Sequence, residues 1–407
     1  MREMKDSGID IVGEIPKGWK LERLRYLCDI TTGNQDTQDA DPDGEYDFYV
    51  RSPKIEKSTK YSFDGEGILM AGDGAGAGRI FHHAYGKYAV HQRVYIINNI
   101  REIDSSFLFY YISNVFPKLM DKGSAQSTVP SVRLPMLLNF TLALPDKKKQ
   151  NLISSYLDTQ CSEIDATAED IQKEISLLED YKKSVITEAV TKGLNPDAEM
   201  KDSGIEWIGE IPKHWEIIKG KYVLEYLQKP IKDDDGVITC FRDGEVTLRS
   251  NRREDGFTLS DKEIGYQGID VGDLVVHGMD GFAGAIGISD SRGKASPVLN
   301  VLNSKYNKRY LMYYLRSMAF SNIFVALASG IRVRSCDLRW NKLAELPYPT
   351  TNYAEQTEIV NYIDTKCSEI DSLIADKKRQ LDILADYKKS LIYEYVTGKK
   401  EVPVNDF

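Results

Sequence analysis

The chain has 407 residues, enough for roughly two to four domains and a sizeable hydrophobic core. Hydrophobic residues make up 42% and charged residues 28% of it, so the composition excludes disordered, collagenous and disulfide-scaffold proteins. The formal net charge of −9 disfavours binding of nucleic acid over the whole surface, because Lys and Arg must neutralise phosphates. A DNA-binding protein of this charge needs local basic surfaces or a partner.

The cysteines and apolar runs bear on the location of the protein. Five cysteines lie far apart and form no CxxC pair, which favours reduced thiols in a cytoplasm and disfavours a zinc site. No apolar run approaches the ~18 residues that a membrane span needs. Residues 1–10 are charged and lack the apolar segment of an export signal. We therefore expect a cytoplasmic protein with no membrane partner and no metal.

An internal duplication organises the chain. Residues 4–19 return at 200–215 with twelve of sixteen positions identical, at an offset of 196. Two further pairs of similar segments share an offset of 206: 156–165 with 362–371, and 181–191 with 387–397. A solenoid has more and shorter repeats, so two copies indicate duplicated halves with internal pseudo-twofold symmetry. Two equivalent globular domains without functional symmetry are the alternative.

The segments 146–192 and 351–397 are predicted to form long helices, because neither contains Pro or Gly and both carry apolar residues at heptad spacing. Lys182, Lys377 and Lys388 interrupt the apolar stripes, where they either weaken the seam or extend their ammonium groups to solvent. A helix of about 44 residues is on the order of 65 Å long. Two such helices most simply pack on each other, and a twofold relationship makes them antiparallel. An ordinary amphipathic core helix is the alternative.

The block that precedes each long helix is predicted to be mixed α and β, with short strands between Gly, Asp and Asn turns. In the first block we expect strands at 46–51, 67–70, 88–97 and 139–144 and a helix at 107–119. In the second block we expect strands at 237–242, 273–277, 285–289 and 297–302 and a helix at 306–318.

A glycine-rich run at 72–79 invites a cofactor interpretation. The dinucleotide pattern GxGxxG fails because Ala77 occupies the last glycine position, and no Lys-Ser or Lys-Thr follows as in a P-loop. A tight hairpin loop that approaches another backbone closely is favoured, with a counterpart at 278–284. The five histidines form no HExxH motif and no GxSxG occurs, so we expect no catalytic centre. An S-adenosylmethionine-dependent enzyme that uses the glycine run is the alternative.

Basic and polar residues near predicted loops are the candidates for DNA contact. Arg and Gln can read base edges, and Lys and Arg hold phosphates. Each residue singly is more typical of a charged surface loop than of base contact, but as a group in matched places of two blocks they favour a DNA-facing side. The candidates are Asp73, Arg79, His82, His91, Gln92, Arg93 and Arg133 in the first block, and Arg242, Arg249, Arg252, Arg253, His277, Arg292, Arg332, Arg334 and Arg339 in the second.

The sequence resembles the specificity subunit of type I restriction-modification enzymes. The resemblance rests on the doubled KDSGI-x-x-x-GEIPK-x-W segment, and on the two long helices that follow Pro-ended blocks and begin near Gln150 and Glu355-Gln356. It also rests on the stretches HGMDGFAGAIG and SGIRVRSCDLRW of the second block, and it covers essentially the whole chain.

The resemblance implies an α+β fold with two target-recognition domains, 1–145 and 197–349, separated by two long antiparallel spacer helices within 146–196 and 350–407. It implies a non-catalytic subunit of an antiviral system, whose domains each read one half of a bipartite, asymmetric site in double-stranded DNA. The helices would set the gap and dock two modification (methyltransferase) subunits, and restriction (translocase and endonuclease) subunits would join them.

The resemblance implies no cofactor in this chain, because S-adenosylmethionine, ATP and Mg²⁺ are expected on the partner subunits. Two alternatives stay open: the specificity subunit of a fused type II-like restriction and methylation system, and a helical scaffold whose blocks bind proteins.

Overall fold

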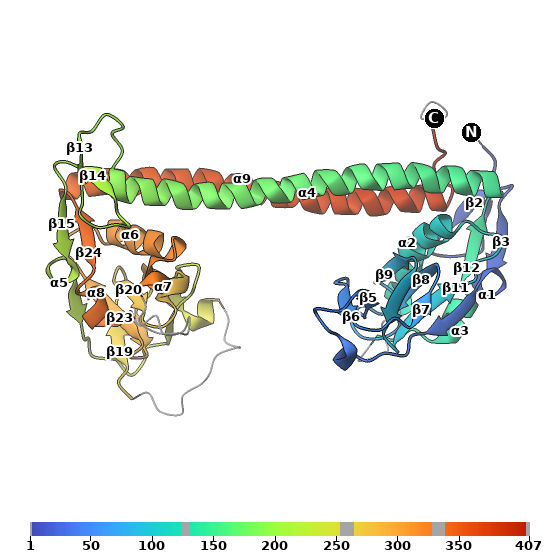
Figure 1. The fold of residues 1–407 in the computed structure, drawn as a ribbon, viewed down its shortest axis with the longest axis horizontal. Helices are drawn as coiled ribbons and strands as arrows, with labels where there is room; N and C mark the ends of the chain where they lie inside the picture. The colour runs from blue at the N-terminus through green and yellow to red at the C-terminus, as the bar shows by residue number, and fades with distance from the viewer. Residues whose placement is uncertain (1, 124–129, 253–263, 328–337, 404–407) are drawn as a thin grey trace. The chain divides into compact units, whose positions relative to one another are not determined.

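The computed structural model describes residues 2–123, 130–252, 264–327 and 338–403 (Figure 1). The chain divides into two compact units, one made of residues 1–171 and 379–407 and the other of residues 172–378. Each unit therefore contains one mixed block and one half of each long helix. The predicted α+β class is confirmed. Among the described residues, no helix is long and apolar enough to cross a membrane.

The first unit is built on a four-stranded antiparallel sheet in the order β4-β11-β8-β9, formed by β4 (Asp29–Thr32), β11 (Val94–Asn98), β8 (Gly67–Ala71) and β9 (Phe81–Ala84). A second sheet has the order β6-β5-β10-β7, from β6 (Glu56–Ser58), β5 (Tyr46–Tyr49), β10 (Lys87–Val90) and β7 (Phe63–Asp64). The other elements of the first block are β1 (Met4–Asp6), β2 (Glu14–Pro16), β3 (Lys20–Arg23), α1 (Leu24–Leu27), η1 (Thr37–Asp39), α2 (Ser105–Gly123), α3 (Leu134–Leu138) and β12 (Thr141–Leu144).

The second unit repeats the main sheet in the order β16-β23-β20-β21, with β16 (Glu225–Leu227), β23 (Leu299–Asn303), β20 (Leu274–His277) and β21 (Ile286–Ile288). Its other strands pair as β13 (Met200–Asp202) with β14 (Glu210–Pro212), β15 (Glu216–Lys219) with β24 (Pro347–Thr350), β17 (Ile238–Cys240) with β18 (Val246–Leu248), and β19 (Gln267–Ile269) with β22 (Gly293–Ala295). Its helices are α5 (Gly220–Val223), η3 (Arg249–Asn251), η4 (Gly281–Ala283), α6 (Lys308–Phe320), α7 (Ile323–Ala326) and α8 (Trp340–Leu343). The structural duplication thus extends into the two blocks, although their sequences show little similarity to each other.

The predicted strand at 88–97 is wrong as a single strand. A turn at 91–93 divides it into β10 and β11, which belong to different sheets. His91 stabilises this turn, because its Nδ1 accepts a hydrogen bond from the Arg93 N–H at 3.0 Å and its carbonyl accepts one from the Val94 N–H at 2.9 Å. The other predicted strands and both block helices are present with small shifts of their ends.

The two long helices are α4 (Lys147–Lys192) and α9 (Tyr353–Val396), as the heptad spacing predicts (Figure 1). In the first unit, Leu157 of α4 and Leu391 of α9 belong to the same core as the α2 residues Phe107 and Tyr111. In the second unit, the core likewise joins both long helices to the buried face of α6. Each block and its two helix halves therefore share one hydrophobic core.

The ion pairs between the long helices are reciprocal. In the first unit Lys388 contacts Asp165 at 2.6 Å, and in the second unit Lys182 contacts Asp371 at 2.6 Å. Lys182 and Lys388 occupy equivalent positions of the duplication, as do Asp165 and Asp371. Each pair joins the late part of one helix to the earlier part of the other, which confirms that the two helices run antiparallel within each unit.

The lysines that interrupt the heptad stripes extend out of the seam toward carboxylates of the facing helix. Lys377 contacts Glu174 at 2.5 Å, and Lys182 and Lys388 reach the aspartates described above. All three lysines are partly buried, so their stems cover the seam while their ammonium groups remain in contact with solvent.

A buried glutamine joins each block to the start of its long helix. Gln150 accepts a hydrogen bond from the Asp104 N–H at 2.8 Å and donates one to the Pro145 carbonyl at 2.9 Å. Gln356 makes the equivalent bonds, from the Asn307 N–H and to the Thr351 carbonyl, both at 2.8 Å. These buried bonds orient each block on its helix.

Each long helix ends at a glycine in the left-handed region, Gly193 at φ +72° and Gly398 at φ +71°. A Cβ on Gly398 would lie 2.7 Å from Pro16 Cδ, whereas a Cβ on Gly193 would lie no closer than 3.3 Å to Trp215 Cζ2. Gly398 is therefore required both for its conformation and for space, whereas Gly193 is required mainly for its conformation.

We predict that Gly398→Ala destabilises the chain more than Gly193→Ala. The left-handed conformation costs either alanine roughly 1–2 kcal/mol, and only Gly398→Ala adds a clash with a proline ring. Urea unfolding followed by circular dichroism should show the lower midpoint for Gly398→Ala. Equal midpoints, or a lower midpoint for Gly193→Ala, would contradict this account of the two helix ends.

Candidate DNA interface

A glycine-rich hairpin loop occupies the same place in both units. Residues 72–80 join β8 to β9, and residues 278–285 join β20 to β21, with each strand pair antiparallel. A Cβ on Gly72 would lie 2.9 Å from the Arg93 carbonyl oxygen, and a Cβ on Gly76 would lie 2.9 Å from the Arg51 carbonyl oxygen. The glycines thus let the first loop pack directly against the segments that carry these two arginines.

Asp73 of the first loop joins two arginines from separate segments. Its carboxylate contacts Arg51 at 2.9 Å and Arg93 at 2.5 Å. Burial raises the pKa of Asp73, but the hydrogen bonds from Arg93 and Arg51 lower it by more. The pKa of Asp73 therefore lies below its usual value. Both guanidinium groups remain exposed enough to contact a ligand, beside a cavity of about 440 Å³ that Asp73 and Arg51 line.

His91 and Gln92 shape the turn beside this cluster. His91 is buried, and its Nε2 lies 3.4 Å from Thr37 Oγ1. Burial, followed by the nearby Arg51 charge, lowers its pKa, so the ring is neutral near pH 7 and positions the turn. Gln92 is exposed and donates a hydrogen bond to Asp36 at 2.9 Å. Gln92 and Arg93 are therefore the accessible side chains of this turn.

The other candidates of the first block do not join the Asp73 cluster. His82 is hydrogen-bonded to the Ser52 carbonyl at 3.2 Å, and burial lowers its pKa. Arg79 forms an ion pair with Asp121 at 2.6 Å. Arg133 is exposed directly before α3.

In the second unit, four predicted residues line one cavity of about 640 Å³: Arg242, Arg249, Arg252 and His277. Arg242 contacts Asp280 of the second hairpin loop at 3.0 Å, which parallels the contact of Arg93 with Asp73. His277 Nδ1 accepts the Asp280 N–H at 2.9 Å, and burial lowers the pKa of this ring. The histidine therefore orders the loop as a neutral group.

The remaining two arginines of this cavity are held by different contacts. Arg252 contacts Asp243 at 2.7 Å and Glu245 at 2.9 Å, and its guanidinium lies 4.2 Å from the centre of the Phe241 ring. Arg249 Nε donates to Thr239 Oγ1 at 3.3 Å. The chemistry of the second cluster therefore differs from that of the first.

Arg292 lies in a separate ion-pair network and does not line this cavity. Its guanidinium contacts Asp235 at 2.9 Å and Asp270 at 2.5 Å, and it also donates to the Pro230 carbonyl. Hydrogen bonds from Lys229 and Arg292 lower the pKa of Asp270 to about 2. These contacts indicate that Arg292 stabilises its own loops.

Arg339 lies directly before α8, and its Cγ would be 3.7 Å from a Cβ on Gly278 of the hairpin loop. Arg253, Arg332 and Arg334 lie outside the described residues. Sequence reasoning missed Arg51 and Asp280, which complete the two clusters. An Asp at a similar place in both glycine-rich loops was the available signal for Asp280.

The comparisons with known proteins agree with this architecture. A sequence-family model described as "Type I restriction modification DNA specificity domain" matches residues 16–177. The type I restriction enzyme EcoDI specificity subunit of Escherichia coli is 23% identical, over 95% of this chain and 90% of that protein. The MjaVIII specificity subunit of Methanocaldococcus jannaschii is 24% identical, over 95% of this chain and 94% of that protein.

A solved structure that describes the assembly and conformational transition of the type I R-M system contains a chain with the same fold. It matches with a TM-score of 0.64 and 13% identity, over 95% of this chain and 99% of that chain. Residues 16–177 thus match the family of type I restriction-modification DNA specificity domains. Over nearly its whole length the chain is similar to type I restriction enzyme specificity subunits.

Proposed function

We propose that this specificity subunit is non-catalytic and that each block reads one half of a bipartite, asymmetric site in double-stranded DNA. The observation that carries the proposal is the same hairpin loop in two copies of one sheet, with unlike side chains around it. Equivalent placement suits two readers of one duplex, and different chemistry suits two different half-sites.

The arginine clusters supply the chemistry for reading bases. Arg can bond bidentately to guanine in the major groove, and a carboxylate beside it holds the guanidinium in one orientation. Asp73 does this for Arg51 and Arg93, and Asp280 does it for Arg242. Because the chain as a whole carries a charge of −9, partner subunits would provide further basic surface for the phosphates.

Two equivalent apolar patches on the long helices suit two copies of one partner. Leu177 and Tyr181 are 69% and 53% exposed on α4, and the equivalent residues Ile383 and Tyr387 are 61% and 51% exposed on α9. The first patch continues into an apolar groove beside Leu373. Exposed aromatic and aliphatic side chains of this size mark protein interfaces.

The occupants of these patches would be two modification subunits, which would carry S-adenosylmethionine and methylate the DNA. Restriction subunits with ATP and Mg²⁺ would join them for translocation and cleavage. The assembly would act in the cytoplasm as an antiviral defence.

We predict that Arg93→Ala relaxes one half of the recognised site and Arg242→Ala relaxes the other. Loss of a bidentate contact should remove about 1–3 kcal/mol of discrimination at one base pair. The methylated motif, sequenced in a host that carries the chain and its modification partner, measures the effect. Arg101→Ala, which removes an exposed arginine paired with Asp29, is the control and should leave the motif unchanged. Relaxation of both halves by one variant would contradict the assignment.

We also predict that Tyr181→Asp and Tyr387→Asp each release one modification subunit, and that the double variant releases both. Placing a carboxylate at the centre of an apolar interface should cost roughly 2 kcal/mol or more of binding free energy. Native mass spectrometry counts the bound subunits. Tyr222→Asp, at a 67% exposed tyrosine of the second block, should keep two. Two bound subunits in the double variant would exclude these patches as the docking site.

A further inference from the structure

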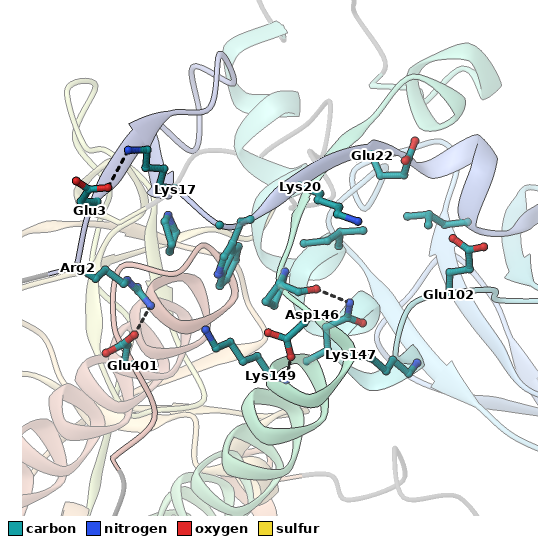
Figure 2. Close-up of a pocket in the computed structure, with 17 residues that line it drawn as sticks. Arg2, Glu3, Lys17, Lys20, Glu22, Glu102, Asp146, Lys147, Lys149 and Glu401 are labelled. Carbon is teal, nitrogen blue, oxygen red and sulfur yellow. Dashed lines mark hydrogen bonds and ion pairs between the residues drawn. The ribbon is translucent and has the colours of Figure 1, made fainter.

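A cavity of about 840 Å³ lies in the first unit, between the first strands, the start of α4 and Glu401 near the end of the described chain (Figure 2). Charged side chains of both signs line it. Figure 2 shows Arg2 directed toward Glu401 and Lys17 toward Glu3, and each pair is 2.8 Å apart. Three further lysines of the lining, Lys20, Lys147 and Lys149, form no ion pair with any residue that the structure describes.

Trp19 gives this cavity an unsatisfied hydrogen-bond donor. The side chain lines the cavity and is only 4% exposed. Its indole N–H is buried and has no acceptor among the described residues. Buried donors are nearly always paired, so an unpaired one indicates a missing partner.

The second unit contains the partner that the first lacks. Trp215 is equivalent to Trp19, and its indole N–H donates to Glu355 Oε1 at 2.9 Å. His214 contacts the other oxygen of the same carboxylate at 2.9 Å. The duplication aligns Glu355 with Lys149 and His214 with Gly18. The first unit has therefore replaced the acceptor by a cation and the histidine by a residue without a side chain.

The two indoles occupy equivalent places. A Cβ on Gly193 would lie 3.3 Å from Trp215 Cζ2, and a Cβ on Gly398 would lie 2.9 Å from Trp19 Cζ2. The Trp19 N–H, which is bonded to the atom next to Cζ2, therefore points to the place that a carboxylate on residue 149 would fill.

The start of α4 adds to the preference for an anion. Its first turn carries Lys147 and Lys149 with no acidic side chain, whereas the first turn of α9 carries Glu355. The positive end of a helix dipole disfavours cations and favours anions. The Asp146 carboxylate, directly before the helix, accepts the Lys149 N–H at 3.0 Å, and its carbonyl accepts the Gln150 N–H at 3.0 Å. In Figure 2 the acidic residues Glu22 and Glu102 lie at the end of the cavity opposite to Arg2 and Glu401.

We infer that this cavity binds a carboxylate group from another molecule, which accepts the Trp19 indole hydrogen bond and pairs with Lys149. The source is either an acidic side chain of a partner polypeptide or a small carboxylic acid. The site does not depend on DNA reading, and it makes the equivalent junctions of block and helix in the two units chemically unequal.

The indole N–H signals of the ¹⁵N-labelled full chain test this inference. The chain has four tryptophans, so Trp→Phe variants assign the four signals. Sodium acetate is the probe, titrated against sodium chloride at constant ionic strength. We expect acetate to move the Trp19 indole proton downfield to saturation. The Trp215 signal, whose acceptor is already present, should not move.

Two charge-matched variants separate this site from a general charge effect. In Lys149→Glu the new carboxylate should shift the Trp19 signal downfield without acetate, and acetate should add nothing. Lys148→Glu makes the same charge change at a residue that does not line the cavity, and it should respond as the unchanged chain does. Equal acetate responses in both variants would overturn the inference.

The same indole signal, measured in the complex with the modification subunit, identifies the source of the carboxylate. A Trp19 signal that is already downfield in the complex without acetate shows that the partner supplies the carboxylate. A signal that still responds to acetate in the complex shows a site for a small acid. A signal that stays unshifted both with acetate and in the complex overturns the inference.

Discussion

The antiparallel seam of the two long helices is the constraint on which the rest of the structure depends. Equivalent lysines reach equivalent aspartates in opposite directions, so one set of contacts, used twice, fixes the helix register. Exposed ion pairs of this kind contribute little free energy singly. The larger contribution comes from the apolar heptad residues, which continue into the core of each block. Block and helix therefore cannot move independently within a unit.

The two blocks share one sheet order but carry unlike side chains at their candidate DNA-contact positions. Each main sheet presents a glycine-rich hairpin with an aspartate that binds an arginine, but the surrounding groups are Arg51, Gln92 and Arg93 in one block and Arg249 and Arg252 in the other. A neutral histidine orders one turn in each block: His91 orders the turn at 91–93, and His277 orders the hairpin at 278–285. The junctions of block and helix also share one fold but differ in chemistry. Glu355 accepts the indole hydrogen bond of Trp215, whereas Lys149 at the equivalent position leaves the indole N–H of Trp19 without an acceptor among the described residues.

The sequence predicted the features that depend on local pattern. Heptad spacing and the lack of Pro and Gly predicted both long helices, and short strand segments between Gly, Asp and Asn turns predicted several strands of each block. The shared sheet order was not predictable, because the blocks lack a common sequence signal. The division of 88–97 was missed because a histidine side chain makes the turn there. Arg51 was missed because it meets Asp73 only after folding. Asp280 was missed although both glycine-rich loops contain an aspartate at a similar place. The carboxylates that engage Arg292 are distant in sequence, so that network was not predictable.

Removal of one heptad from each long helix tests most directly whether the helix pair sets the gap between half-sites. Residues 170–176 and 376–382 are suitable, because they contain both partners of the Glu174–Lys377 pair and so preserve the seam on either side. Seven residues correspond to about 10 Å, or about three base pairs of DNA. We predict that the methylated motif keeps both half-sites and that its non-specific gap shortens accordingly. An unchanged gap in an active complex would contradict the account.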